Sequence, residues 1–256
     1  MKLGLEGRRV LVTGGSKGLG AAIARELVGE GARVAICSRN EAEVLAAGDE
    51  IGTAHAQAAD VTDPEQVREF VARSAEALGG IDCLVNNAGG AHPGSFETLA
   101  DENWVADLDV KLFSLIRCSR GVLPHMRSAG GGRIVNIGSV YARYPDPTFF
   151  ATSVNRAAGN SFTKTLALEV AKDNILVNGV NIGFVITPQW ENIHRRRAPE
   201  LPREEFFDSF AAQEVPLGRF GTPDEVSGLV TFLLSERGSY ITGASIDVAG
   251  GMGRYV

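Results

Sequence analysis

Sulfur-containing residues are scarce in this chain, whose 256 residues include three cysteines and three methionines. Cys37, Cys83 and Cys118 are odd in number and scattered along the chain, which argues against a framework of disulfide bonds. Two of them fall within or beside short apolar runs. We therefore expect small core residues in a reducing compartment, and we place the protein in the cytoplasm.

Long apolar runs and an excess of positive charge are also missing. No stretch approaches the roughly 18 apolar residues that a membrane-spanning helix needs, and residues 1–7 lack the apolar run of a signal peptide. The net charge of −6 argues against nucleic acid or an anionic membrane as a partner. His194 has no second ligand at useful spacing, so we expect no metal site.

With 44% apolar and 22% charged residues, the chain can bury one large core. Short apolar runs alternate with segments of helical periodicity, which predicts α/β architecture. We expect a three-layer, Rossmann-type, doubly wound parallel sheet of about seven strands in a single domain, residues 1–256. The predicted strands lie near residues 8–12, 33–37, 54–58, 82–86, 132–138, 175–180 and 244–248.

A glycine-rich turn follows the first predicted strand without a gap and opens a helix at residues 20–28. Glycines let the backbone approach a pyrophosphate, whose charge then meets free N–H groups at the helix N-terminus. Such a turn can also bind nothing, but the surrounding βαβ unit favours phosphate binding. The cofactor-binding residues predicted here are Gly14, Ser16, Lys17, Gly18, Leu19 and Gly20.

The end of the second predicted strand indicates which nucleotide binds. It carries Ser38-Arg39-Asn40, with no acidic residue to hydrogen-bond a ribose 2′-hydroxyl. Arg39 and Lys17 can instead converge on a 2′-phosphate, which favours NADP(H) over NAD(H). The alternative is that Arg39 is a solvated residue at a strand end.

Three motifs together resemble the short-chain dehydrogenase/reductase family. They are the T-G-x-x-x-G-x-G spacing at residues 13–20, the Asn-Asn-Ala-Gly of residues 86–89, and Ser139 after an apolar strand. The likeness runs essentially from end to end and implies an NADP-dependent oxidoreductase acting on a carbonyl or alcohol. It adds these residues to the predicted cofactor site: Asp60, Val61, Asn87, Ala88, Gly89, Gly183, Val185 and Thr187.

The resemblance breaks at the catalytic tetrad, which in this family is Asn, Ser, Tyr and Lys. Carried over position by position, only the serine matches, as Ser139. The tyrosine position holds Thr152, the lysine position holds Arg156, and the asparagine position holds Lys111. No Tyr-x-x-x-Lys occurs elsewhere in the sequence.

These replacements remove the proton donor that the resemblance implies. Thr152 can hydrogen-bond a substrate oxygen, but an aliphatic hydroxyl is a much weaker acid than a phenol. Arg156 keeps a positive charge and can bind ribose hydroxyls and so serve the cofactor, but it does not release a proton. The substrate oxygen would be held by Ser139 and Thr152, and the source of the proton stays open.

Two nearby groups can supply that proton. Tyr141 follows Ser139 at the carboxyl end of a predicted strand, where open α/β sheets place reacting groups. Lys111, if crowded by the Arg156 charge, would lose its proton more readily than a free lysine. The alternatives are that Tyr141 only shapes the substrate pocket and that Lys111 only pairs with an acid. The candidate acids for Lys111 are Asp107, Asp109 or another acid across a helix interface.

Residues 187–220 are the least family-like segment, and in the family this region closes over substrate. We expect an apolar lid over a small-molecule substrate with a hydrophobic portion, formed by Trp190, Phe206, Phe207 and Phe210. The run Arg195–Arg197 can meet a carboxylate, a phosphate or an acyl-carrier group. Alternatively it is a solvated face neutralised by Glu200, Glu204, Glu205 and Asp208.

Long helical patterns lie near residues 102–128 and 151–172, and by resemblance to the family they predict a homodimer or homotetramer. An apolar stripe that faces the protein's own core would give the same pattern. Two other functions fit the same motifs. One is a lyase or isomerase that uses the bound nucleotide without net redox change. The other is a catalytically inactive NADP-binding sensor or scaffold, and fold alone does not separate these functions.

Overall fold

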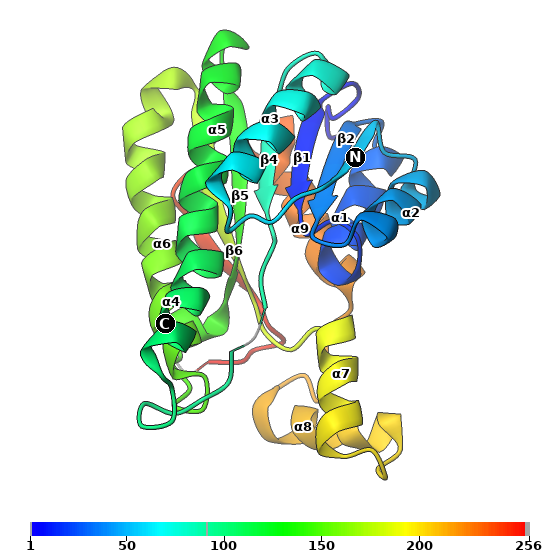
Figure 1. The fold of residues 1–256 in the computed structure, drawn as a ribbon, viewed down its shortest axis with the longest axis vertical. Helices are drawn as coiled ribbons and strands as arrows, with labels where there is room; N and C mark the ends of the chain where they lie inside the picture. Colours follow the sequence, from blue (N-terminus) through cyan, green and yellow to red (C-terminus); the bar gives the residue numbers. More distant parts are fainter. Residues whose placement is uncertain (1, 91, 254–256) are drawn as a thin grey trace.

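The computed structural model describes residues 2–90 and 92–253, and a single parallel sheet forms its centre (Figure 1). The seven strands run in the order β3-β2-β1-β4-β5-β6-β7, so the strand order reverses between β1 and β4. Each strand predicted from the sequence is present. Their bounds are β1 (Arg9–Thr13), β2 (Arg33–Ser38), β3 (His55–Ala58), β4 (Cys83–Asn86), β5 (Gly132–Ser139), β6 (Ile175–Ile182) and β7 (Ser245–Val248).

Helices cover both faces of the sheet and complete three layers (Figure 1). One face is covered by α1 (Gly18–Gly29), α2 (Glu41–Ile51) and α9 (Pro223–Leu234). The other is covered by α3 (Pro64–Leu78), α5 (Ser114–Ser128) and α6 (Phe150–Val170). The doubly wound α/β fold expected from the sequence is therefore confirmed.

Two apolar clusters, one on each face of the sheet, hold these layers together. The alternation of side chains along β1 sends Val10 and Val12 to the α1 side and Leu11 to the α3 side. All three are fully buried, and each contributes roughly 1.5–3 kcal/mol relative to an exposed side chain. Buried on both faces, the central strands are near-continuous apolar runs. All three cysteines are buried and free, as expected.

The helix predicted near residues 102–128 is interrupted. It consists of α4 (Asp101–Leu108), a π-helical turn at Asp109–Phe113, and α5. A single π turn inside an α-helix is uncommon in proteins, and those that occur often lie at functional sites. Lys111 lies in this turn, which faces α6.

Two further helices, α7 (Pro188–Arg197) and α8 (Arg203–Glu214), project beyond the carboxyl ends of the strands (Figure 1). They occupy the segment where we expect a lid. Short 3₁₀ turns lie at Val140–Ala142, Ala171–Asp173 and Glu236–Gly238. Within residues 2–90 and 92–253, every helix is too short or too polar to cross a membrane.

Candidate active site

The predicted phosphate loop joins β1 to α1 at the point where the strand order reverses, which is where open α/β sheets bind ligands. Its glycines are required by geometry. A Cβ on Gly20 would lie 2.1 Å from the Gly14 carbonyl oxygen, and Gly14 itself has a φ of +66°. Any side chain at Gly20 would push the loop away from the helix. The close backbone cradle expected from the sequence is therefore present.

The loop is fixed from the neighbouring strand. The Asn87 side-chain amide donates hydrogen bonds to the carbonyl oxygens of Thr13 and Gly14, both at 3.0 Å. In return the Thr13 hydroxyl accepts the backbone N–H groups of Asn87 (3.0 Å) and Ala88 (3.1 Å). The structure thus brings the Asn-Asn-Ala-Gly motif and the glycine loop together.

The two cations expected at the ribose are both exposed. Lys17 forms an ion pair of 3.0 Å with Glu43, and Arg39 lies at the end of β2. Asn40 caps α2 by accepting the N–H of Glu43 at 3.0 Å, and the residues at the end of β2 are Ser38, Arg39 and Asn40. This arrangement leaves positive charge beside the glycine loop.

Other predicted cofactor residues have partners of their own. The Asp60 carboxylate accepts the N–H (2.9 Å) and the hydroxyl (2.8 Å) of Thr62, while Val61 is buried. Val185 forms an isolated parallel bridge with Gly221. Thr187 precedes α7, whose first residue sits so close to the loop that a Cβ on Gly18 would lie 3.1 Å from its ring. The start of α7 and the glycine loop are therefore neighbours.

Lys111 is the most unusual ionisable residue of the site, because its side chain is only 1% exposed. It forms an ion pair with Asp107, one turn earlier and also fully buried. It donates a hydrogen bond of 2.8 Å to the Thr152 hydroxyl, and Asn155 donates one of 2.8 Å to Asp107. His92 reaches Asp107 from the loop after β4, at 2.7 Å. We call these residues the Lys111 cluster: His92, Asp107, Lys111, Thr152 and Asn155.

Burial and charge oppose each other in this cluster. Burial, with the Arg156 charge adding to it, lowers the pKa of Lys111 to about 8, although Asp107 acts in the other direction. Burial alone would raise the pKa of Asp107. The Lys111 charge and the hydrogen bonds from Lys111, Asn155 and His92 outweigh it and keep that pKa below its usual range. Because both pKa values are lowered, Asp107 is anionic and lies beside a Lys111 that loses its proton more easily than a free lysine.

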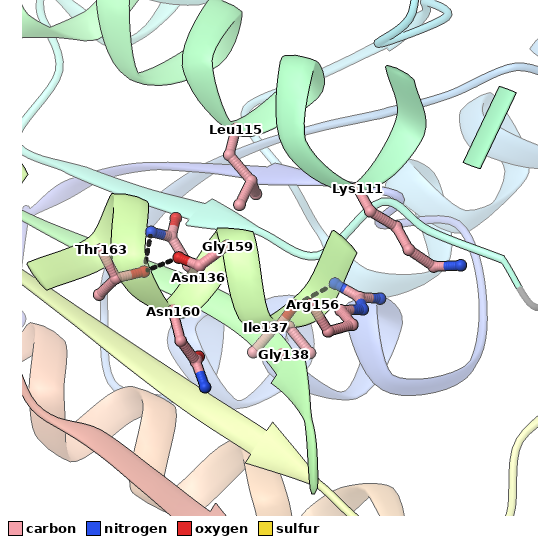
Figure 2. A pocket seen from close by; sticks show the side chains of 9 residues that line it. All are labelled: Lys111, Leu115, Asn136, Ile137, Gly138, Arg156, Gly159, Asn160 and Thr163. Atoms are coloured by element: carbon pink, nitrogen blue, oxygen red, sulfur yellow. Dashed lines mark hydrogen bonds between the residues drawn. The ribbon is translucent and has the colours of Figure 1, made fainter. Parts of the chain in front are cut away.

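Arg156 lies beside the cluster on α6 and is held by the sheet. Its Nη1 donates to the Ile137 carbonyl oxygen at 2.7 Å. Burial lowers the pKa of Arg156 to about 10, so the group stays charged at neutral pH. Figure 2 shows the charged ends of Lys111 and Arg156 on the same side of a small pocket. The pocket is lined by Lys111, Leu115, Asn136, Ile137, Gly138, Arg156, Gly159, Asn160 and Thr163.

The other proton donor considered from the sequence, Tyr141, is placed less favourably. Its backbone N–H donates to the Ser139 hydroxyl (3.3 Å), and its ring stacks on Phe149 with centroids 5.5 Å apart. Burial, with Asp146 adding to it, raises the pKa of Tyr141 above its usual value. A higher pKa makes the phenol a weaker acid, whereas the pKa of Lys111 moves toward neutrality.

The profile of a family described as enoyl-(acyl carrier protein) reductase matches residues 14–253. The short-chain reductase protein NovJ of Streptomyces niveus is 37% identical over 94% of this chain and 92% of its own length. L-sorbose reductase of Gluconobacter frateurii, solved with NADPH and L-sorbose, has a TM-score of 0.96 at 34% identity, covering 100% of both chains.

A short-chain oxidoreductase of Pseudomonas aeruginosa was solved with NADPH bound and is described as containing an atypical catalytic center. It has a TM-score of 0.90 and 35% identity, and the match covers 98% of this chain and 99% of that one. The chain belongs to the short-chain dehydrogenase/reductase family. The resemblance predicted from the sequence is therefore confirmed.

Within this short-chain dehydrogenase/reductase, the segment expected as a lid has its own apolar cluster. Phe206 and Phe207 are buried, and Trp190 packs on Phe210 and Phe220 with centroids 5.8 and 4.9 Å apart. The aromatic residues named from the sequence thus lie together. The run Arg195–Arg197 is exposed, and among the described residues none of the three arginines forms an ion pair.

Sequence reasoning missed three features of this short-chain dehydrogenase/reductase site: the roles of His92 and Asn155, and the π turn at Lys111. For the partner of Lys111 it left Asp107, Asp109 and an acid across a helix interface open. The structure selects Asp107, whereas Asp109 pairs with Arg117 at 2.7 Å. The i, i+4 spacing of Asp107 and Lys111 was the available signal. Across the described ranges, no group of three or more His, Cys, Asp or Glu side chains is placed to hold a metal ion.

Proposed function

We propose that this protein is an NADP(H)-dependent oxidoreductase that reduces a carbonyl group, with Lys111, Ser139, Thr152 and Arg156 in place of the family's tetrad. The observation that carries the proposal is the hydrogen bond of 2.8 Å from the buried Lys111 ammonium to the Thr152 hydroxyl. A group able to release a proton near neutral pH is thereby joined to a hydroxyl at the position of the family's tyrosine.

The described residues fit a nicotinamide dinucleotide. The absence of side chains at Gly14 and Gly20 lets the loop pack closely against the start of α1 and the Asn87 segment, as a loop that presents its backbone to a pyrophosphate requires, and Lys17 and Arg39 supply charge for a 2′-phosphate. Bound NADPH would supply the hydride. The solved relatives named above bind NADPH, which supports the choice of cofactor.

The chain's own residues then handle the oxygen and the proton. The hydroxyls of Ser139 and Thr152 hold the substrate oxygen, and Lys111 passes a proton to it through Thr152. Arg156 remains charged, binds ribose hydroxyls and keeps the pKa of Lys111 low. General acid catalysis contributes typically ~10²–10⁴-fold, so an imperfect donor gives a slower enzyme and not an inactive one.

The aromatic cluster of α7 and α8 favours a small substrate with an apolar portion. Tyr141 packs against the same cluster, which supports a role in shaping the substrate pocket. The segment 187–220 would act as the substrate lid. We also propose self-association through α4 and α6, because Val105 (64% exposed), Val154 (48%) and Leu168 (74%) leave apolar side chains on these helices uncovered.

The proposal is tested by titrating NADPH and, in parallel, NADH while following the fluorescence of Trp104 and Trp190, and then by scanning carbonyl compounds with the nucleotide that binds. We expect tighter binding of NADPH and substrate-dependent loss of its absorbance. Tight binding without turnover indicates the sensor, and conversion of substrate without net oxidation indicates the lyase or isomerase. Absence of binding contradicts the assignment of the glycine loop.

A further inference from the structure

The Lys111 cluster reaches the surface at a single residue, His92. The His92 side chain is 36% exposed, and its Nδ1 lies 2.7 Å from Oδ1 of Asp107, whose side chain is fully buried. The same Oδ1 accepts Lys111 and, at 3.3 Å, the hydroxyl of Thr152. An unbroken series of hydrogen bonds therefore connects solvent with the hydroxyl that is to hold the substrate oxygen.

Asp107 is held in one orientation by its partners. Its second oxygen, Oδ2, accepts the side-chain amide of Asn155 at 2.8 Å, so the carboxylate cannot rotate without breaking several bonds. A carboxylate accepts only, so Nδ1 of His92 carries the hydrogen in this contact. This leaves Nε2, the other ring nitrogen, to exchange protons with water.

We propose that His92 and Asp107 are the proton path that recharges Lys111 from solvent, with Asp107 also positioning the Lys111 amine against Thr152. This inference rests on the proposed function for its catalytic meaning. Neither residue belongs to the tetrad positions, and neither needs to touch substrate or cofactor.

The proton balance follows the hydrogen bonds. As hydride reaches the carbonyl carbon, the Thr152 hydroxyl gives its proton to the substrate oxygen and takes one from the Lys111 ammonium. Lys111 is left as a neutral amine. Water first protonates Nε2 of His92, and His92 then gives its Nδ1 proton to the Asp107 carboxylate, which passes it to Lys111. The neutral imidazole returns to the Nδ1–H tautomer by exchanging protons with solvent before the next turnover. One solvent proton is consumed for each carbonyl reduced.

The other groups that face Lys111 do not offer an equivalent path. Arg156, from α6, retains its proton in proteins, and Thr152 has no proton to spare without resupply. Asp107 comes from the preceding turn of Lys111's own helix. Asp109 is engaged by Arg117 instead. Among the described groups around Lys111, His92 is the titratable one that combines exposure with a direct bond to Asp107.

The kinetic test uses His92→Gln, which keeps an amide donor for Asp107 but carries no transferable proton. His125→Gln is the matched control, because His125 lies in the last turn of α5, at the opposite end of that helix from the π turn that carries Lys111. We expect kcat for reduction to fall roughly tenfold or more, within the range for general acid catalysis. KM and NADPH affinity should stay unchanged, and kcat should lose part of its pH dependence. In His92→Ala, added imidazole should restore kcat.

A second readout needs no turnover. The exchange of the Lys111 ammonium protons with water can be followed by nitrogen-15 NMR in the protein without nucleotide, with Lys111→Met identifying the signal. We expect exchange several-fold slower in His92→Gln than in wild type and in His125→Gln. Equal exchange rates, or a kcat in His92→Gln within about twofold of wild type, would overturn the proton path.

The two readouts separate this inference from the proposed function. If the wild type binds NADPH but reduces no carbonyl, the proposed function fails, and the exchange measurement still decides whether His92 delivers protons to Lys111. If the wild type turns over and either readout is unchanged by His92→Gln, only the proton path fails.

Discussion

The glycine loop and the Lys111 cluster lie at the same end of the sheet but are built in opposite ways. The loop works through its backbone, and its key feature is the close backbone packing at Gly20 and Gly14, which leaves no room for a Cβ. The Lys111 cluster works through charged side chains removed from water, with Asp107 fully buried. Substitutions should therefore harm the loop by adding atoms and the cluster by removing charge.

The largest expected effect concerns the buried pair. Asp107→Asn leaves Lys111 without a counter-ion, and Lys111→Met leaves Asp107 without one, so each should lower the free energy of unfolding by roughly 3–5 kcal/mol. The double variant Asp107→Leu/Lys111→Met removes both charges and should cost much less than the sum. Denaturant unfolding of the three variants measures this. Purely additive losses would show that the pair is not energetically coupled.

The glycine loop should respond to a single methyl group. Gly20→Ala places a Cβ against the Gly14 carbonyl oxygen and should cost roughly 1–3 kcal/mol of stability and most of the NADPH affinity. Gly29→Ala, in the same helix, meets no atom within 4 Å and should be neutral or slightly stabilising. Thermal unfolding and NADPH titration compare them. Similar behaviour of both variants would contradict the steric argument.

A smaller effect is expected from the charges beside the loop. Arg39→Ala should weaken NADPH binding about tenfold, in line with the loss of one charge-assisted hydrogen bond at an exposed site, and should leave the affinity for NADH unchanged. Glu43→Gln releases Lys17 from its ion pair and should act in the opposite direction. Parallel titrations with both nucleotides decide this. An equal loss for NADPH and NADH on Arg39→Ala would remove the basis for selecting NADP.

A gradual effect, spread over several pH units, is expected in the pH dependence of stability. Lys111 titrates at about 8 in the folded protein and near 10.5 when unfolded, so the unfolded chain binds more protons between these values. The contribution of Lys111 to the free energy of unfolding therefore rises with pH through that window, by at most about 1.4 kcal/mol per pH unit. The measurement is wild-type stability minus that of Asp107→Leu/Lys111→Met at several pH values. A difference that falls with pH would contradict the lowered pKa.

Sequence patterns predicted the loop far better than the cluster, for a physical reason. The glycine turn, its strand and its helix are neighbours along the chain, so local spacing defines them, and each predicted strand of the sheet was found. The cluster joins His92, Asp107 and Thr152, which come from three separate segments. Only the Asp107–Lys111 spacing was local, and the π turn and the burial of both charges depend on packing between helices.

The central claim is that hydride moves from NADPH to a carbonyl carbon at a site with threonine in place of tyrosine. It is tested most directly by incubating the protein with a carbonyl substrate and NADPH deuterated at the transferable position of its nicotinamide. The mass of the product is then determined by mass spectrometry. We predict one deuterium on the carbinol carbon, with transfer greatly slowed in Lys111→Met. A product formed without deuterium, or NADPH bound tightly with no carbonyl reduced, would contradict the claim.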